Sequence, residues 1–161
     1  MSTYRNLPDH TRVWVYQSNR ELTDSEVIDI RNRSAIFAEQ WAAHGSKLRA
    51  AIEVFYNRFL VIFVDEDHAE ASGCSIDSSV QFVRDLEVNH NISLMDRMLL
   101  AYKQGDDIKV EKMADFETSM ENGTITEETI VFNNLVATKG DFESSWEVKL
   151  KDSWHARMLA S

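Results

Sequence analysis

The sequence predicts an α+β protein with the ferredoxin-like order βαββαβ, followed by a C-terminal β/α extension. Two segments with apolar residues at helical spacing separate stretches rich in β-branched and aromatic residues. The run Phe59–Val64 is apolar, which is typical of a central strand covered on both faces. Because no linker-like segment divides the chain, we expect a single domain, residues 1–161, with a core of about 12–104 and an extension of about 108–155.

The first strand and the first helix are predicted by adjacent patterns. Residues 12–18, RVWVYQS, alternate and are rich in β-branched and aromatic side chains. Thr23 and Glu26 have the spacing of a capping box, which predicts a helix N-terminus. Six side chains then share one helical face: Val27, Ile30, Ser34, Phe37, Ala38 and Trp41. His44 and Gly45 are typical of a helix C-terminus, so the helix is expected to end there.

The middle of the sequence predicts a strand pair, a second helix and a fourth strand. KLRAAIEVFYNRFLVIFVDE indicates two strands around a tight turn near residues 56–58. The second helix is expected to begin close to Ser75 or Cys74, either of which could serve as its N-cap. RMLLAYKQ, residues 97–104, then completes the ferredoxin-like order as its last strand.

The extension continues with mixed patterns. We expect a strand at residues 108–113, a helix at residues 113–123, and strands at residues 128–138 and 144–152. Asn133–Asn134 interrupts an otherwise apolar strand pattern. Paired amides at such a place indicate a bulge, a strand end or a polar contact in a groove.

Composition and charge disfavour several classes of partner. The net charge is −10, from 27 acidic and 17 basic residues, and no Lys/Arg cluster occurs. Nucleic acids and anionic membrane surfaces both require such clusters, so neither is an expected partner. A single cysteine, the absence of an apolar N-terminal segment and the absence of a long apolar run favour a cytoplasmic protein.

LVIFVDE, residues 60–66, copies a nucleotide-binding motif. In P-loop ATPases an apolar strand leads to an Asp near the magnesium ion, here Asp65, and a Glu near the attacking water, here Glu66. That motif works beside a GxxxxGK[ST] loop that holds the phosphates, and none of the five glycines begins one. The alternative is that these carboxylates solvate the exposed end of a buried strand.

Three further motifs carry a resemblance to a known group of proteins. They are GCSID at Gly73–Asp77, VFNNLV at Val131–Val136 and DSWH at Asp152–His155. With them the chain, over most of its length, resembles small bacterial proteins labelled "ABC transporter ATPase". The resemblance implies ATP hydrolysis, although the chain contains no LSGGQ-like signature.

Cys74 is the candidate nucleophile. A cysteine at a helix start is exposed to the helix dipole, which favours the thiolate of a nucleophile or redox sensor. His68 is the nearest candidate base in the sequence, and a neighbouring aspartate could orient it. The alternative is a small apolar core residue, the usual role of a free cysteine. DEDH, residues 65–68, lacks the EF-hand spacing, so we expect no metal site, and no motif indicates a cofactor.

Four residues are candidates for ligand binding. Trp14, Trp41 and Trp146 could line an apolar pocket, and Asn134 could place a polar group in it. The alternative is that the tryptophans are core residues or cover a subunit interface.

The architecture, together with the absence of a complete catalytic motif, favours a non-catalytic binding or interaction module. Its partner would be a protein or a small ligand, and homo-oligomer formation through a sheet edge or a tryptophan-bearing face is an additional hypothesis. The alternatives are a cysteine-dependent enzyme or thiol sensor that uses Cys74, and ATP hydrolysis.

Overall fold

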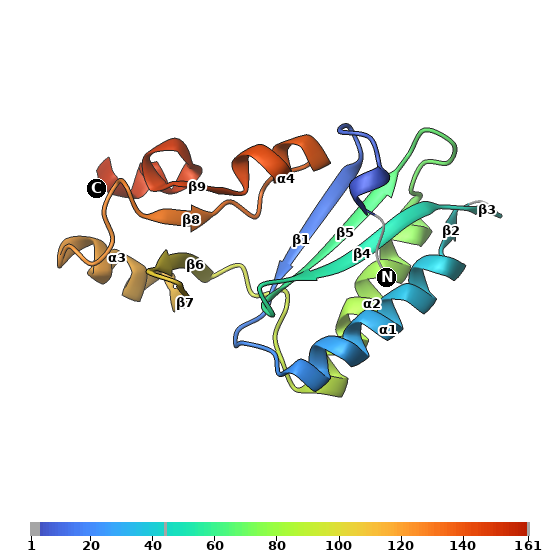
Figure 1. Ribbon diagram of the computed structural model, residues 1–161, viewed down its shortest axis with the longest axis horizontal. Coiled ribbons are helices and arrows are strands. Elements are labelled where there is room, and N and C mark those ends of the chain that lie inside the picture. Colours follow the sequence, from blue (N-terminus) through green and yellow to red (C-terminus); the bar gives the residue numbers. More distant parts are fainter. Residues whose placement is uncertain (1–3, 44, 161) are drawn as a thin grey trace.

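The computed structural model describes residues 4–43 and 45–160 and has the mixed helix and strand content of an α+β protein. The described strands form a three-stranded sheet, a four-stranded sheet and a two-stranded hairpin, and all their pairs are antiparallel. Figure 1 shows the two larger sheets beside each other, with two long helices packed under the first sheet. No helix in the described part of the chain is long and apolar enough to cross a membrane.

The first sheet has β5 between β1 and β4. Its strands are β1 (Arg12–Gln17), β4 (Arg49–Phe55) and β5 (Phe59–Asp65). Every residue of β5 is buried, as the sequence predicts for a central strand. The β4–β5 turn lies at the expected residues, where Tyr56 and Asn57 have φ angles of 55° and 54°.

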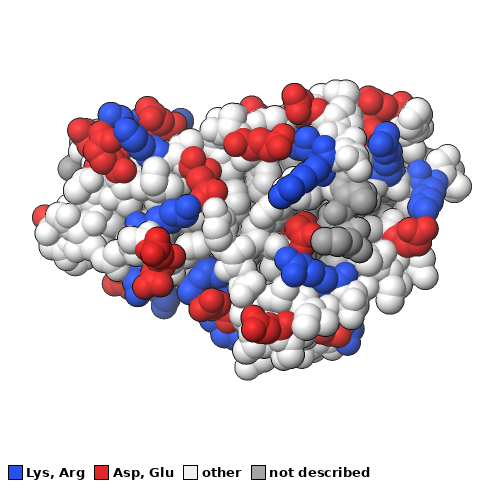
Figure 2. All heavy atoms as spheres, in the orientation of Figure 1, with Lys and Arg blue, Asp and Glu red and all other residues white. Residues whose placement is uncertain are grey.

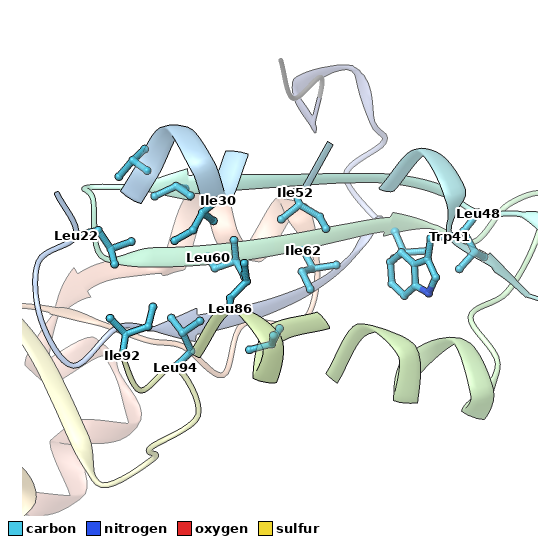
Figure 3. Close-up of a cluster of buried hydrophobic side chains, with 14 of the residues drawn as sticks. Leu22, Ile30, Trp41, Leu48, Ile52, Leu60, Ile62, Leu86, Ile92 and Leu94 are labelled. Atoms are coloured by element: carbon cyan, nitrogen blue, oxygen red, sulfur yellow. The ribbon is translucent and has the colours of Figure 1, made fainter. Parts of the chain in front are cut away.

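Helices α1 (Asp24–Gln40) and α2 (Gly73–His90) cover one face of this sheet. Leu60 and Ile62 of β5 point toward them and meet Ile30 of α1 and Leu86 of α2 in one hydrophobic cluster (Figure 3). Burying side chains of this size contributes roughly 1.5–3 kcal/mol each, so this layer anchors the sheet.

The first helix begins as expected and ends earlier. Thr23 and Glu26 form the capping box, but the helix stops at Gln40. The chain then turns back through the hairpin of β2 (Ala42–Ala43) and β3 (Ser46–Lys47), and Gly45, with φ of 78°, lies in its turn. The Gly45 signal therefore belongs to a hairpin rather than to a helix end. His44 lies outside the described residues.

The second helix has a different cap from the expected one. Ser72 is the N-cap and forms a capping box with Ser75, which occupies the third helical position. Cys74 and Ser75 therefore lie inside the first turn, because Ser72 offers the same hydroxyl acceptor earlier in the chain.

The second sheet has the order β7-β6-β8-β9. Its strands are β6 (Leu99–Gln104), β7 (Asp107–Lys112), β8 (Ile130–Phe132) and β9 (Glu147–Lys149). The helices of this half are α3 (Met113–Glu121) and α4 (Lys139–Ser145), and short 3₁₀ helices occupy Tyr4–Asn6, Leu150–Asp152 and Trp154–Ala160. Leu100 and Tyr102 of β6 pack with Phe116 of α3 in a third hydrophobic cluster.

The expected ferredoxin-like arrangement is not confirmed. The strand that should complete it, β6, lies in the second sheet and pairs with β7 and β8. The outer side of β1 instead meets a short segment after β8, through a single bridge between Arg12 and Thr138. Local periodicity predicted β6 as a strand but carries no information on which sheet it joins.

The expected strands of the extension are shorter than predicted. After β8 the chain turns, because the Asn133 N–H donates to the Trp146 carbonyl (2.7 Å) and the Asn133 side chain accepts from the Leu135 N–H (3.1 Å). Asn133–Asn134 therefore marks a strand end, one of the readings that the sequence left open. The expected strand at residues 144–152 is reduced to β9 between α4 and a 3₁₀ helix.

Both sheets contribute to one hydrophobic cluster on the other face of β5. Phe59 and Phe63 of β5 pack there with Phe132 of β8, Phe142 of α4 and Trp146. The Tyr56 hydroxyl also donates to the Glu147 carboxylate of β9 (2.8 Å). The β4–β5 turn is thereby joined to the second sheet, which fixes the space between the sheets.

Candidate binding groove at the β1 edge

β1 has a neighbouring strand on one side only, because it ends the first sheet. In an antiparallel ladder, successive residues direct their N–H and C=O groups to opposite sides. The even-numbered residues face β5, and Ser18, next in this series, donates its N–H to the Arg58 carbonyl of the β4–β5 turn (2.7 Å). Val13, Val15 and Gln17 therefore direct their backbone groups away from the sheet.

Both ends of this outer side are occupied by other parts of the chain. At one end the Val13 N–H donates to the Ala137 carbonyl (2.9 Å), in the segment that precedes α4. At the other end the Asn19 N–H donates to the Ser93 carbonyl (3.0 Å), in the loop after α2. These contacts limit the open stretch of the strand to a few residues.

The middle of the outer side is open. Within the described residues, no hydrogen bond is made by the Val15 N–H, the Val15 C=O or the Gln17 N–H. Backbone groups of a strand are strong hydrogen-bonding groups that need a partner or water. The stretch from Val13 to Gln17 therefore presents an unfilled strand edge between two filled ends.

This open stretch lies in a groove of about 650 Å³ between the two sheets. Its lining residues include members of β1, β6 and β8, and Figure 1 shows β6 and β8 on the same side of β1. Its walls include apolar side chains from five segments: Val15, Val80, Leu94, Met95, Leu135 and Trp154. Leu135 is 71% exposed, a high fraction for a leucine, and it leaves an apolar surface at the groove.

A chain of hydrogen bonds supports one end of the groove. The Trp146 Nε1 donates to Asn134 Oδ1 (2.9 Å), and Asn134 Nδ2 donates to Gln17 Oε1 (2.9 Å). Gln17 Nε2 in turn donates to the Leu99 carbonyl of β6 (3.2 Å). The side chain of Asn134 thus links β1 to Trp146 in the core, Gln17 links β1 to β6, and together they hold the groove wall in place.

Three charged side chains line the groove. The Arg12 guanidinium lies 4.6 Å from the centre of the Trp14 ring, and the Asp96 carboxylate accepts a backbone N–H two residues further on (2.9 Å). Arg97 is exposed and makes no hydrogen bond or ion pair with the described residues. Burial raises the pKa of Tyr16, and the nearby Arg97 charge opposes that shift.

The four ligand-binding candidates divide into two groups. Trp14 and Asn134 line the groove, so the structure brings these two together. Trp41 and Trp146 are each only 3% exposed and belong to the hydrophobic clusters. The Trp41 Nε1 donates to the Ser75 carbonyl (2.8 Å), which places it under the start of α2 (Figure 3).

Cys74 and His68 are both exposed, and no hydrogen bond joins Cys74 to a histidine in the described part of the chain. Other histidines have different partners: His10 contacts Asp67 (2.8 Å), His90 contacts Asp29 (2.7 Å). The arrangement needed for a cysteine nucleophile, a base within hydrogen-bond reach, is absent among these residues.

The carboxylates after β5 have structural partners. Asp65 is 1% exposed, so it does not solvate an exposed strand end as expected; its Oδ2 accepts from Arg49 (3.2 Å) and its Oδ1 from the Asp67 N–H (3.0 Å). The donor atoms of Asp65, Asp67 and His10 lie within 4.8 Å of one another. These groups could approach a cation, but their hydrogen bonds to each other and to Arg49 already account for the cluster.

Sequence reasoning missed several residues of the groove, among them Val15, Leu135 and Arg97. The sequence held one indication that Leu135 lies outside a strand, because it follows two asparagines that end β8. The opening at Val15 carried none, because it depends on which strands are neighbours in the sheet.

Acidic and basic side chains are interspersed on the face of the molecule shown in Figure 2, with uncharged areas between them.

No protein-family model matches the chain, and the searches of curated proteins and of solved structures found no significant match.

Proposed function

We propose that the protein is a non-catalytic binding module that accepts an extended segment of a partner protein at the β1 edge. The observation that carries the proposal is the unpaired backbone of Val15, in an apolar groove whose ends are filled by other parts of the chain. Domains that recognise extended peptides add the peptide to a sheet edge, with main-chain hydrogen bonds for affinity and side-chain pockets for specificity.

The dimensions of the opening suit a short segment. Val13 to Gln17 spans four residue steps, which is roughly 13 Å of strand. A bound segment of three to five residues could bond to the Val13 carbonyl, to both groups of Val15 and to the Gln17 N–H. Its side chains would alternate between the walls near Leu94 and Leu135.

A second copy of the chain is a poorer occupant of the groove. In each copy the Val15 backbone is recessed between the segments that contain Ala137 and Ser93. Two recessed strands cannot approach within the roughly 4.8 Å that separates paired strands unless these walls move. An extended segment of three to five residues fits between these walls, so a partner's peptide is favoured over self-pairing.

A small apolar ligand is the second candidate. The groove volume of about 650 Å³ lies within the range of roughly 300–1,000 Å³ that is common for small-molecule sites. Such a ligand would contact Trp14, Leu135 and Trp154 and leave the Val15 N–H open. The two candidates therefore differ in what they do to one backbone amide.

The test selects random nine-residue peptides on the immobilised protein and maps the selected peptides by residue-resolved amide exchange. In the free protein we expect fast exchange at Val15 and Gln17 and slow exchange at Trp14 and Tyr16, which face β5. Bound peptides should slow exchange at Val15. Selected peptides that leave Val15 unprotected, or a Val15 amide already protected in the free protein, would contradict strand addition.

A further inference from the structure

Arg97 is a cation without a partner in the groove of an acidic protein. The chain has 27 acidic and 17 basic residues, so exposed arginines generally find carboxylates nearby. Arg12 lies against Trp14 and within 3.7 Å of Glu66, whereas Arg97 makes no hydrogen bond or ion pair with the described residues. The guanidinium therefore remains available at the groove.

The Tyr16 hydroxyl is a second donor beside it. Tyr16 lines the groove next to Arg97, and its hydroxyl forms no hydrogen bond with the described residues. Its pKa is raised by burial, so the hydroxyl keeps its proton at neutral pH and can donate. The one carboxylate that lines the groove, Asp96, already accepts a backbone N–H.

We infer that the segment bound at the β1 edge presents a carboxylate to Arg97 and the Tyr16 hydroxyl. This inference rests on the proposed strand addition. A guanidinium and a phenol offer donors that match a carboxylate, and charge-assisted hydrogen bonds are stronger than neutral ones. The carboxylate belongs either to an Asp or Glu side chain or to the C-terminus of the bound segment.

The strand geometry places this carboxylate. On an added strand, the residue opposite Tyr16 is adjacent to the residue that pairs with Val15, and its side chain lies on the same face as the Tyr16 ring. Tyr16 packs on the face of the sheet covered by α1 and α2. The acidic group is therefore one position from the residue that bonds to Val15, on the side of the helices.

The test uses a positional library of nine-residue peptides of alternating Val and Thr. Each position in turn carries Glu, Gln or Lys, and each peptide is made with an acetylated N-terminus and either a free or an amidated C-terminus. We expect about tenfold tighter binding for Glu than for Gln at one position, or for the free acid than for the amide, because charge-assisted hydrogen bonds are stronger than neutral ones.

Two variants identify the residue responsible. Arg97→Gln should abolish the preference for the carboxylate, whereas Arg84→Gln, at an exposed arginine of α2 outside the groove, should keep it. Peptides that protect Val15 without any preference for a carboxylate would overturn this inference and leave strand addition standing. Failure of every peptide to protect Val15 would overturn both.

Discussion

The two edges of the first sheet differ in how their outward backbone groups are treated. On β4, the outward Val54 N–H donates to the Glu53 carboxylate (2.8 Å) and the Val54 carbonyl accepts from Arg31 of α1 (3.2 Å). Arg31 and Glu53 also pair with each other at 2.7 Å. On β1, the corresponding groups of Val15 have no partner in the described residues.

The difference shows that a hollow beside a strand does not by itself indicate strand addition. A space of about 600 Å³ also lies between α1 and β4, yet Arg31 and Glu53 are among the residues that line it. Their ion pair covers the strand edge with charge, a common protection against unwanted pairing. The outward N–H and C=O of Ile52 on β4, like those of Val15, make no hydrogen bond in the described residues. The two sites therefore differ in the charged cover of Arg31 and Glu53 at β4 and in the more apolar lining of the groove at β1.

The largest expected effect comes from removing the open amide itself. Val15→Pro deletes the outward N–H and adds ring atoms where a strand would dock, while Trp14 and Tyr16 keep their bonds to β5. We expect the affinity of selected peptides to fall about 100-fold, because the ring keeps a docking strand from making its two hydrogen bonds to residue 15, which contribute about 1–1.5 kcal/mol each. Isothermal titration calorimetry measures the change.

Ala50→Pro is the matched control, because Ala50 directs its N–H to the outer side of β4. Both variants place a proline on an edge strand of the same sheet, and circular dichroism establishes that each is folded. Equal losses of affinity in the two variants would show that binding responds to general destabilisation, not to the β1 edge.

The next largest effect is a loss of folding stability in acid, which we expect from a buried histidine beside the groove. His155 is fully buried, and burial lowers its pKa to about 4 from an ordinary value of 6.5. Its ring stacks on Trp154, a groove residue, at 3.9 Å. The unfolded chain takes up this proton near pH 6.5 and the folded chain only near pH 4. Stability is therefore complete above pH 6.5 and falls by about 3 kcal/mol as the pH drops to 4.

Urea unfolding at pH 7, 5.5 and 4.5 measures this loss. His155→Gln removes the titrating ring, so its stability should change less over this range even if the variant is less stable at pH 7. His68→Gln, at an exposed histidine that makes no hydrogen bond or ion pair with the described residues, should keep the dependence of the wild-type protein. Parallel curves for wild type and His155→Gln would assign the acid sensitivity to other groups.

Much of the fold could be predicted from local patterns. The Thr23 capping box, the apolar run of β5 and the alternation of β1 act over a few residues, and the structure has these elements at the expected places. The short helix α4 was missed, because its seven residues carry little periodicity and include a glycine. The sheet joined by β6 depends on contacts far apart in the sequence, such as the bond from Gln17 to Leu99.

The candidate site was less predictable for the same reason. Trp14 and Trp41 look alike as sequence features, yet one lines the groove and the other is buried under α2. The position of Trp41 follows from the end of α1 at Gln40, whereas that of Trp14 follows from the place of β1 at the edge of the first sheet. Val15 resembles any strand valine, and only the absence of a neighbouring strand makes its backbone a candidate site.

Removing the amide that supports the groove should have an intermediate effect. Asn134→Ala leaves the Trp146 Nε1 and the Gln17 Oε1 without their present partner. A buried polar group left unpaired costs about 1–3 kcal/mol, so we expect a loss of about 2 kcal/mol in the free energy of unfolding. Denaturant unfolding measures this loss.

Asn133→Ala is the control, because it loses a bond to the Leu135 N–H. It should lower the free energy of unfolding by less than 1 kcal/mol, roughly the contribution of one exposed hydrogen bond. Similar losses of stability in both variants would show that the Asn134 side chain does not support the groove.

The smallest expected change in stability comes from opening the protected edge. Replacing Arg31 and Glu53 together by alanine removes an exposed ion pair, which contributes about 0–1 kcal/mol, so the double variant should remain folded. It also leaves the Val54 N–H and C=O without their side-chain partners, as at Val15. Because the outer side of β4 makes no hydrogen bond to the backbone of another described segment, we expect its uncovered edge to pair with a second copy. Sedimentation velocity should then show dimers that the wild-type protein does not form at the same concentration.

Arg33→Ala with Asp29→Asn is the control, since these residues form an exposed ion pair on α1 (2.8 Å) and make no contact with the outward backbone of β4. It should stay in the wild-type oligomeric state. If the edge variant does likewise, side-chain cover is not what keeps β4 unpaired. In that case an uncovered strand edge would not attract a partner by itself. Binding at β1 would then depend on the apolar walls of its groove, and these walls alone would distinguish the two edges.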